Sequence, residues 1–307
     1  SEELQSRLSS SELSGYLHNI NLNIFSQALL TEDQALEDKQ NTAFTFEAML
    51  ENININAYES TPSVKNVDGY VFANNSSGFV SFYSENFELG FPTLFLDPWE
   101  LKLAEGKVSW VIDNSEVNIY SDGLRLWRED SSLIYGDFKL SINDESHEDY
   151  LSLALGLQDV IFQDAVKFVP FHVIDKDLYA WLSSSLIAGS VNNGIYYGYG
   201  SVESHSAQNS FTSSIFLQSN NGIVQFDSEW PYVEELEADV IIQNGQLDIK
   251  AKQAKIAGTS LDNLKVHLPE VGEGKANYLM LSADALLTSR LVDYWLLESP
   301  IANNTKD

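Results

Sequence analysis

Two stretches decide the fold predicted for this chain: residues 178–200, LYAWLSSSLIAGSVNNGIYYGYG, and residues 211–231, FTSSIFLQSNNGIVQFDSEWP. The first stretch begins with apolar residues at helical spacing, which predicts one short helix from Asp177 to Ala188. Asp177 is the expected N-cap, because its side chain can accept hydrogen bonds from the free N–H groups of the first turn. The first stretch is therefore expected to begin with one short helix that ends just before Gly189.

After Gly189 the period of apolar residues changes from helical to two, which is typical of strands. The alternation predicts strands over residues 190–200 and 211–226. Within the second stretch, Asn220, Asn221 and Gly222 tolerate positive φ and predict a turn. A helix that feeds a pair of strands is an architectural feature, and it carries no catalytic signature.

The same period of two recurs along most of the chain, with turn signals spaced as in an all-β protein. Asp68-Gly69 and Glu85-Asn86 are among the expected turns, and the second helix is expected over residues 285–297. We therefore predict a mostly β fold, an elongated and mainly antiparallel curved sheet or β-groove with two short helices, about 177–188 and 285–297. Residues 1–307 are expected to form a single elongated segment with a soft division near residues 160–177.

Composition limits the class of partner. The 307 residues are 44% hydrophobic and 12% aromatic, which is typical of a folded chain with a sizeable core. Forty-five acidic and seventeen basic residues give a formal net charge of −28. Such a charge repels phosphate backbones and anionic headgroups, so nucleic-acid binding and attachment to a bilayer surface by charge are not expected.

The chain has no cysteine, which excludes disulfides and thiol chemistry. No apolar stretch approaches the roughly 18 residues needed to span a bilayer. The first residues, Ser1 to Ser11, have neither the basic start nor the apolar core of a signal peptide.

No group of residues predicts catalysis, a metal or a cofactor. The five histidines fall in no metal-binding spacing, and the acidic residues around His147 lack the glycine and spacing of a calcium loop. Nucleotide-binding loops and nucleophile elbows are also missing. Several aromatic residues could form a sugar platform, although on strands they are more often core: Trp110, Trp127, Tyr196, Tyr197, Tyr199 and Trp230. The chain is expected to be no enzyme.

Short motifs in a fixed order give the chain a family resemblance. They include Ile187–Val191, Gly222–Phe226, Trp230-Pro231 and Glu298–Ile301. Other matching positions are Gly15-Tyr16-Leu17, Pro92–Phe95, Leu103, Gly106–Trp110, Leu236, Asn244-Gly245, Ile249 and Gly258. In this order the motifs resemble the YhdP family, large AsmA-like proteins of Gram-negative envelopes. The likeness covers most of the chain.

The resemblance implies a long, curved β-structure with a hydrophobic groove that bridges the inner and outer membranes. It implies a non-enzymatic function, in which phospholipid acyl chains lie along the groove and the outer-membrane permeability barrier is maintained. The resemblance also implies that the chain is one segment of a larger envelope protein. Its expected location is the periplasm of a Gram-negative bacterium, tethered to the inner membrane through an anchor outside this segment. The expected partners are phospholipid and other envelope proteins.

Alternation selects the residues expected to line the groove, since one face of each strand is apolar. The candidates are Phe44, Phe46, Ile53, Ile55, Phe79, Val117, Ile119, Leu151, Leu153, Leu155, Ile215, Leu217, Val224, Phe226, Leu247 and Ile249. The same pattern is compatible with an ordinary protein core.

Two alternatives remain open: a carbohydrate-binding β-sandwich module and a purely structural envelope scaffold. A sugar binder needs exposed aromatic rings in a flat row with polar neighbours, whereas a lipid groove needs aliphatic strand faces left uncovered. A scaffold would have both faces covered by protein.

Overall fold

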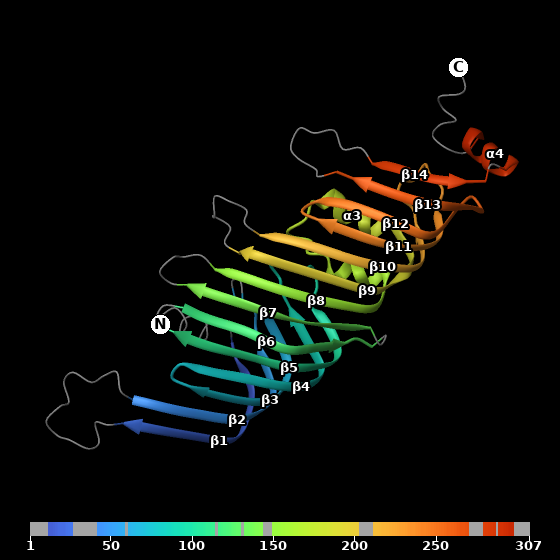
Figure 1. The fold of residues 1–307 in the computed structure, drawn as a ribbon. Helices are drawn as coiled ribbons and strands as arrows, with labels where there is room; N and C mark the ends of the chain where they lie inside the picture. The colour runs from blue at the N-terminus through green and yellow to red at the C-terminus, as the bar shows by residue number, and fades with distance from the viewer. Residues whose placement is uncertain are drawn as a thin grey trace.

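The chain folds into one open sheet of fourteen strands, each paired antiparallel with the next in sequence, from β1 at one edge to β14 at the other (Figure 1). This is a computed structural model, and it describes residues 12–26, 42–58, 61–113, 116–129, 132–143, 149–202, 211–269, 279–286 and 288–297. The predicted fold class, mostly β with an antiparallel curved sheet, is confirmed.

The strands are long for a globular protein. Their bounds are β1 Ser14–Ser26, β2 Thr42–Ile55, β3 Ser63–Asn74, β4 Ser77–Gly90, β5 Trp99–Asp113, β6 Glu116–Trp127, β7 Leu133–Asn143, β8 Tyr150–Ile161, β9 Leu186–Ser201, β10 Thr212–Val224, β11 Val233–Gln243, β12 Gln246–Ile256, β13 Thr259–Leu268 and β14 Met280–Ala285.

Many strands bend near their middle, and the bend has a local cause. A residue at positive φ interrupts several of them, for example Asn52 (φ 50°), Asn86 (φ 53°) and Asn221 (φ 49°). Asparagine adopts this left-handed conformation more readily than most residues, and one such residue bends a strand as a β-bulge does. Because the bend also shifts the alternation by one residue, the apolar side chains before and after it face the same side of the sheet.

Polar side chains replace ladder hydrogen bonds lost along the bend. The backbone N–H of Asn52 donates to Asp68 Oδ1 (2.8 Å), and the N–H of Asp68 donates to Ser84 Oγ (2.9 Å). Asn66 Nδ2 donates to the carbonyl of Asn86 (2.6 Å). The bend is therefore a satisfied part of the fold, since buried backbone groups must find partners.

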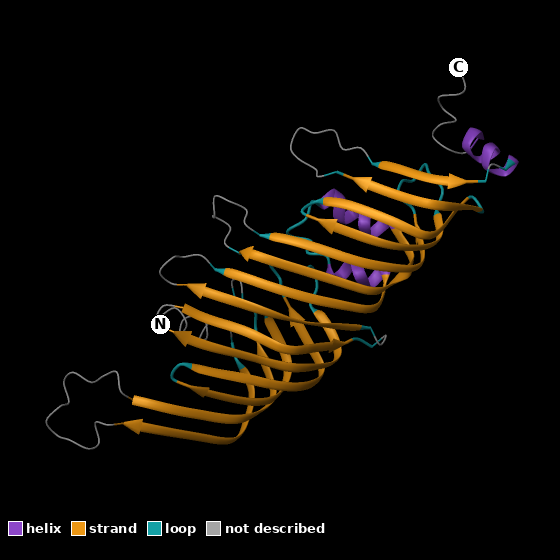
Figure 2. Cartoon of the chain, in the orientation of Figure 1, coloured by secondary structure: helices purple, strands orange, loops and turns teal. Residues whose placement is uncertain are grey.

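In the part of the chain that the structure describes, three short helices accompany the sheet: α2 Phe162–Ala165, α3 Lys176–Ser185 and α4 Ser289–Leu297. A 3₁₀ turn, Val166–Phe168, comes directly after α2. The connection between β8 and β9 carries α2 and α3 inside the curve of the sheet (Figure 2). Two of the helices match the predicted ones near residues 177–188 and 285–297, whereas the sequence pattern does not predict α2.

The first predicted helix begins and ends earlier than expected. Asp175 is the N-cap, because its Oδ1 accepts from the N–H groups of Asp177 (2.9 Å) and Leu178 (3.1 Å). At the other end, Leu186 and Ala188 pair with β10 and belong to β9. Tertiary pairing overrides the helical pattern there.

Three of the predicted turns are wrong. Asp68-Gly69, Glu85-Asn86 and Asn220–Gly222 lie inside β3, β4 and β10, at the bends of those strands. The physical reason is that a turn and a strand bend make the same local demand for residues that tolerate positive φ.

Candidate functional site

One side of the sheet, which we call the inner face, is apolar from β2 to β13. Residues paired across neighbouring strands lie on the same face, so the register identifies its rows. One row is Phe46, Ala73, Gly78, Trp110, Ile119, Leu140, Leu151 and Gly200. A second row is Leu155, Tyr196, Ile215, Ile242, Leu247 and Leu268. Neither row contains a charged residue.

We call the strand segments that carry these two rows the open half of the inner face. Its side chains are mostly half-buried, including Phe46, Leu153 and Ile215. Burial raises the pKa of the Tyr196 phenol, which lies among the apolar side chains of the second row. An apolar surface that the protein leaves partly uncovered can accept an apolar ligand.

The rest of the inner face, at the bend and on the strand segments beyond it, is covered by other parts of the protein. We call it the covered half. Its first cluster of buried side chains is Ile53, Val67, Phe87, Leu101, Ala104, Leu126 and Ile134. The rings of Phe82 and Phe87 stack across the bend of β4 with centroids 5.9 Å apart. This half is an ordinary hydrophobic core.

Two connections that are distant in sequence cover this half. Residues 91–98, between β4 and β5, meet the β8–β9 connection, where the N–H of His172 donates to the carbonyl of Leu94 (3.2 Å). The Phe168 ring packs edge-on against Trp99, with centroids 4.9 Å apart. Arg128 Nη2 lies 3.0 Å from Asp164 Oδ2, and both side chains are largely buried.

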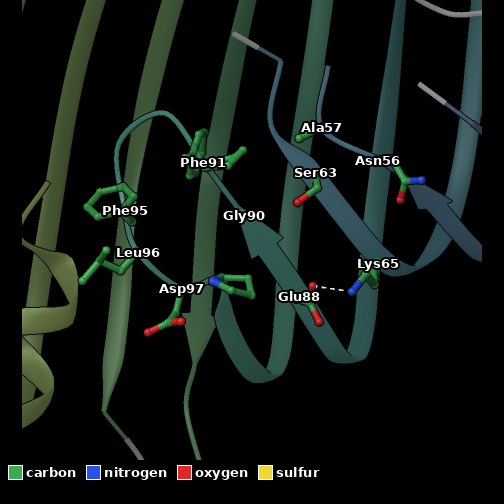
Figure 3. A pocket seen from close by; sticks show the side chains of 12 residues that line it. Asn56, Ala57, Ser63, Lys65, Glu88, Gly90, Phe91, Phe95, Leu96 and Asp97 are labelled. Atoms are coloured by element: carbon green, nitrogen blue, oxygen red, sulfur yellow. Dashed lines mark ion pairs between the residues drawn. The ribbon is translucent and has the colours of Figure 1, made fainter. Parts of the chain in front are cut away.

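A small cavity of about 300 Å³ lies beside residues 91–98 (Figure 3). The rings of Phe91 and Phe95 form one wall, and the ion pair between Lys65 and Glu88 (2.6 Å) lies on another. Its volume is at the lower end of the range for small-molecule sites. Its lining residues include none of the residues in the two rows of the open half.

The structure brings most of the candidate residues together. Eleven lie on the inner face of the open half: Phe44, Phe46, Val117, Ile119, Leu151, Leu153, Leu155, Ile215, Leu217, Leu247 and Ile249. Ile53 and Ile55 belong to the packed cluster at the bend and beyond it, while Phe226 packs against a second buried cluster near Val233. Val224 pairs with Leu186 and Val233 beyond the bend of β10.

Phe79 does not join the others. The ring of its cross-strand partner Phe72 stacks on it with centroids 5.9 Å apart, and Lys107 Nζ lies 4.2 Å from the Phe79 ring centroid. These three side chains lie on the opposite side of the sheet, which we call the outer face. Sequence reasoning also missed inner-face residues such as Trp110, Val108 and Tyr196. Their signal is the cross-strand register, which a single sequence does not display.

The outer face carries the charges. Tyr70 donates a hydrogen bond to Glu47 (2.6 Å), which lowers the pKa of that carboxyl. Asp239 accepts from Lys252 (3.0 Å) and from Gln218 (3.0 Å), and these contacts lower its pKa in the same way. The two faces of the sheet therefore differ sharply in polarity.

The described residues contain no group of three or more His, Cys, Asp or Glu placed to hold a metal ion. His147, the histidine with acidic residues on both sides in the sequence, lies outside the described residues. Among the helices that the structure describes, none is long and apolar enough to cross a membrane.

Comparison with known proteins identifies the family. The family model described as YhdP protein matches residues 1–306. A curated relative, the intermembrane phospholipid transporter YhdP of Escherichia coli (strain K12), is 20% identical over 261 residues, which cover 84% of this chain and 20% of the relative. The chain thus spans about a fifth of that relative's length, and no solved structure matches it. Since the family model covers almost every residue, this chain belongs to the YhdP family.

Proposed function

We propose that the inner face of the open half holds phospholipid acyl chains, as one segment of a non-enzymatic lipid bridge between two membranes. The observation that carries the proposal is the continuity of this face, which is apolar, free of charged residues in its rows and mostly only partly buried from β2 to β13. The name of the relative, an intermembrane phospholipid transporter, supports the same substrate class.

The physical mechanism is passive solvation. Strands lie about 4.8 Å apart, so the face from β2 to β13 is about 50 Å long across the strands. Each methylene kept from water contributes about 0.8 kcal/mol, as it does in a bilayer, so an acyl chain in the groove and one in a bilayer differ little in free energy. Methylenes offer no hydrogen-bonding handle, and the groove should accept many acyl chains.

The proposal includes a location. Residues 1–307 act as one segment of a larger envelope protein in the periplasm, tethered to the inner membrane by an anchor outside this segment. Phospholipid delivered along the bridge supports the outer-membrane permeability barrier, and other envelope proteins can meet the bridge at its ends. A purely structural scaffold is less favoured, because it would have the inner face of the open half covered by protein.

Native mass spectrometry with lipid extraction tests the proposal on the 307-residue chain purified from a Gram-negative host. We expect co-purified phospholipid, and we expect Leu153→Asp combined with Ile215→Asp to remove most of it. These two positions are half-buried on the inner face, so the charges enter the acyl path without entering the packed cluster at the bend.

The matched control is Ala154→Asp combined with Ser214→Asp, which adds the same charges to the outer face of the same two strands. This control should retain the lipid, and circular dichroism should show intact strands in both variants. A wild-type chain that carries no lipid and takes up no fluorescent phosphatidylethanolamine from vesicles would contradict the proposal.

A further inference from the structure

Three neighbouring strands interrupt the charged outer face. Up to the bend of β8 at Asp159, the outer positions of β8, β9 and β10 alternate with the inner rows and contain no Asp, Glu, Lys or Arg. On either side the outer face is charged, with Asp137 and Lys139 exposed on β7 and Asp239 and Lys252 paired on β11 and β12. In a chain with a net charge of −28, an uncharged surface three strands wide is a distinct feature.

Exposed side chains occupy this surface and its border on β7, and we call them the tyrosine platform: Tyr135, Ile195, Tyr197 and Tyr199. Tyr197 and Tyr199 are 50% and 51% exposed and project from β9 on the same side, about 6.8 Å apart along the strand. Ile195 precedes them at 55% exposure, and Tyr135 is 41% exposed. Large rings on a strand surface present flat apolar area at low cost in conformational entropy.

A glycine lets one ring lie flat. Tyr135 pairs with Gly156, and a Cβ at that glycine would come within 2.2 Å of the tyrosine ring. The ring therefore lies over the backbone of β8 and leaves its other side to solvent. The same row continues from Gly156 to Ile195. No side chain at position 156 therefore separates the Tyr135 ring from Ile195 in this row.

Small polar groups surround the rings. Tyr199 pairs with Ser152 on one side and Thr212 on the other, and Tyr197 pairs with Ser214. Hydroxyl groups both donate and accept hydrogen bonds and carry no charge. The combination matches the requirement for a sugar binder, exposed aromatic rings in a row with polar neighbours.

We propose that the tyrosine platform binds a polysaccharide strand of neutral pyranose units. The apolar C–H faces of such sugars can pack on the exposed rings, and the sugar hydroxyls can pair with the surrounding side-chain hydroxyls. Polyanions would be repelled by the net charge of the chain. Because the platform lies on the opposite face from the acyl groove, it can be occupied together with lipid.

Isothermal titration calorimetry of the 307-residue chain with chitohexaose, a neutral hexamer of N-acetylglucosamine, tests this proposal. We expect binding that Tyr197→Thr combined with Tyr199→Thr weakens at least tenfold. Threonine is a good strand former, so the substitutions preserve the local structure. The matched control, Tyr83→Thr combined with Tyr120→Thr, removes two exposed tyrosines outside the platform and should leave affinity unchanged.

The inner-face variant, Leu153→Asp combined with Ile215→Asp, should keep its affinity for chitohexaose while losing lipid. This outcome separates the platform from the proposed lipid function, since each can fail without the other. The proposal is overturned if neither chitohexaose nor cellohexaose binds the wild type at millimolar concentration, or if the platform and control variants weaken binding equally. It is also overturned if sedimentation shows the platform covered by a second copy of the chain that the platform variant releases.

Discussion

The open and covered halves of the inner face carry the same kind of apolar side chain, but the side chains are buried in one half and partly exposed in the other. In the covered half, Leu101 and Ile134 are 3% and 1% exposed, under the two connections that meet there. In the open half, Leu153 and Ile215 have the same apolar character but stay half-exposed. An apolar strand face thus stabilises the fold when protein covers it, and where it stays uncovered it is a surface for a ligand.

The largest expected effect contrasts one residue from each half. Ile134→Ala should lower the free energy of unfolding by about 2–5 kcal/mol, because it leaves a cavity in a packed core. Leu153→Ala should cost less than about 1 kcal/mol, since that side chain already contacts water and loses little packing. Urea denaturation measures both, and equal losses would show that the open half is packed as tightly as the covered half.

An intermediate effect is expected from the ion pair that helps to hold the cover in place. Asp164 lies 3.0 Å from Arg128 and 2.5 Å from Lys167, and its side chain is 14% exposed. Asp164→Asn keeps the shape and removes the charge, which leaves the guanidinium of Arg128 less well compensated. Because the pair is not fully buried, we expect a loss of about 2 kcal/mol, below the value for a completely buried pair.

Glu105→Gln, on the outer face, is the matched control. Glu105 pairs with Arg125 at 3.3 Å on the outer face, where solvent screens the interaction. Such pairs contribute about 0–1 kcal/mol. If the two substitutions cost the same in thermal denaturation, the β8–β9 connection does not shield its ion pair.

The smallest effect is expected at the boundary between the halves. Asn86 holds φ at 53°, so Asn86→Ala should cost about 1 kcal/mol, because a Cβ disfavours the left-handed conformation in the absence of a compensating polar side chain. Asn86→Gly should cost little or nothing, since glycine adopts this conformation freely. Urea midpoints compare the two variants, and an alanine variant as stable as the glycine variant would contradict this explanation of the bend.

Bends of this kind explain which sequence predictions failed. Asp68-Gly69 and Asn220–Gly222 carry turn signals, yet each lies within a strand whose partners continue on both sides. The choice between a turn and a bend depends on whether the chain finds a partner after the interruption. That partner comes from another strand, so local sequence alone does not contain it.

The candidate groove residues illustrate the same limit. Alternation places Leu151, Leu153 and Leu155 on one face, and their cross-strand partners join that face to the rest of the sheet. Phe79 alternates as regularly, but its register places it on the outer face beside Lys107. Alternation with a period of two divides the residues of one strand between the two faces of the sheet. Only the pairing with the next strand shows which of that strand's residues lie on the same face.

Local sequence was enough to specify the β-rich class, the antiparallel tendency, the approximate positions of α3 and α4, and the apolar stripe on most strands. These features depend on periodicity and residue preference, which each segment carries without its neighbours. The bends, the register across fourteen strands, and the division of the inner face into covered and open halves came from tertiary contacts. The reason is that covering requires contact between residues 91–98 and the β8–β9 connection, which only the folded sheet brings together.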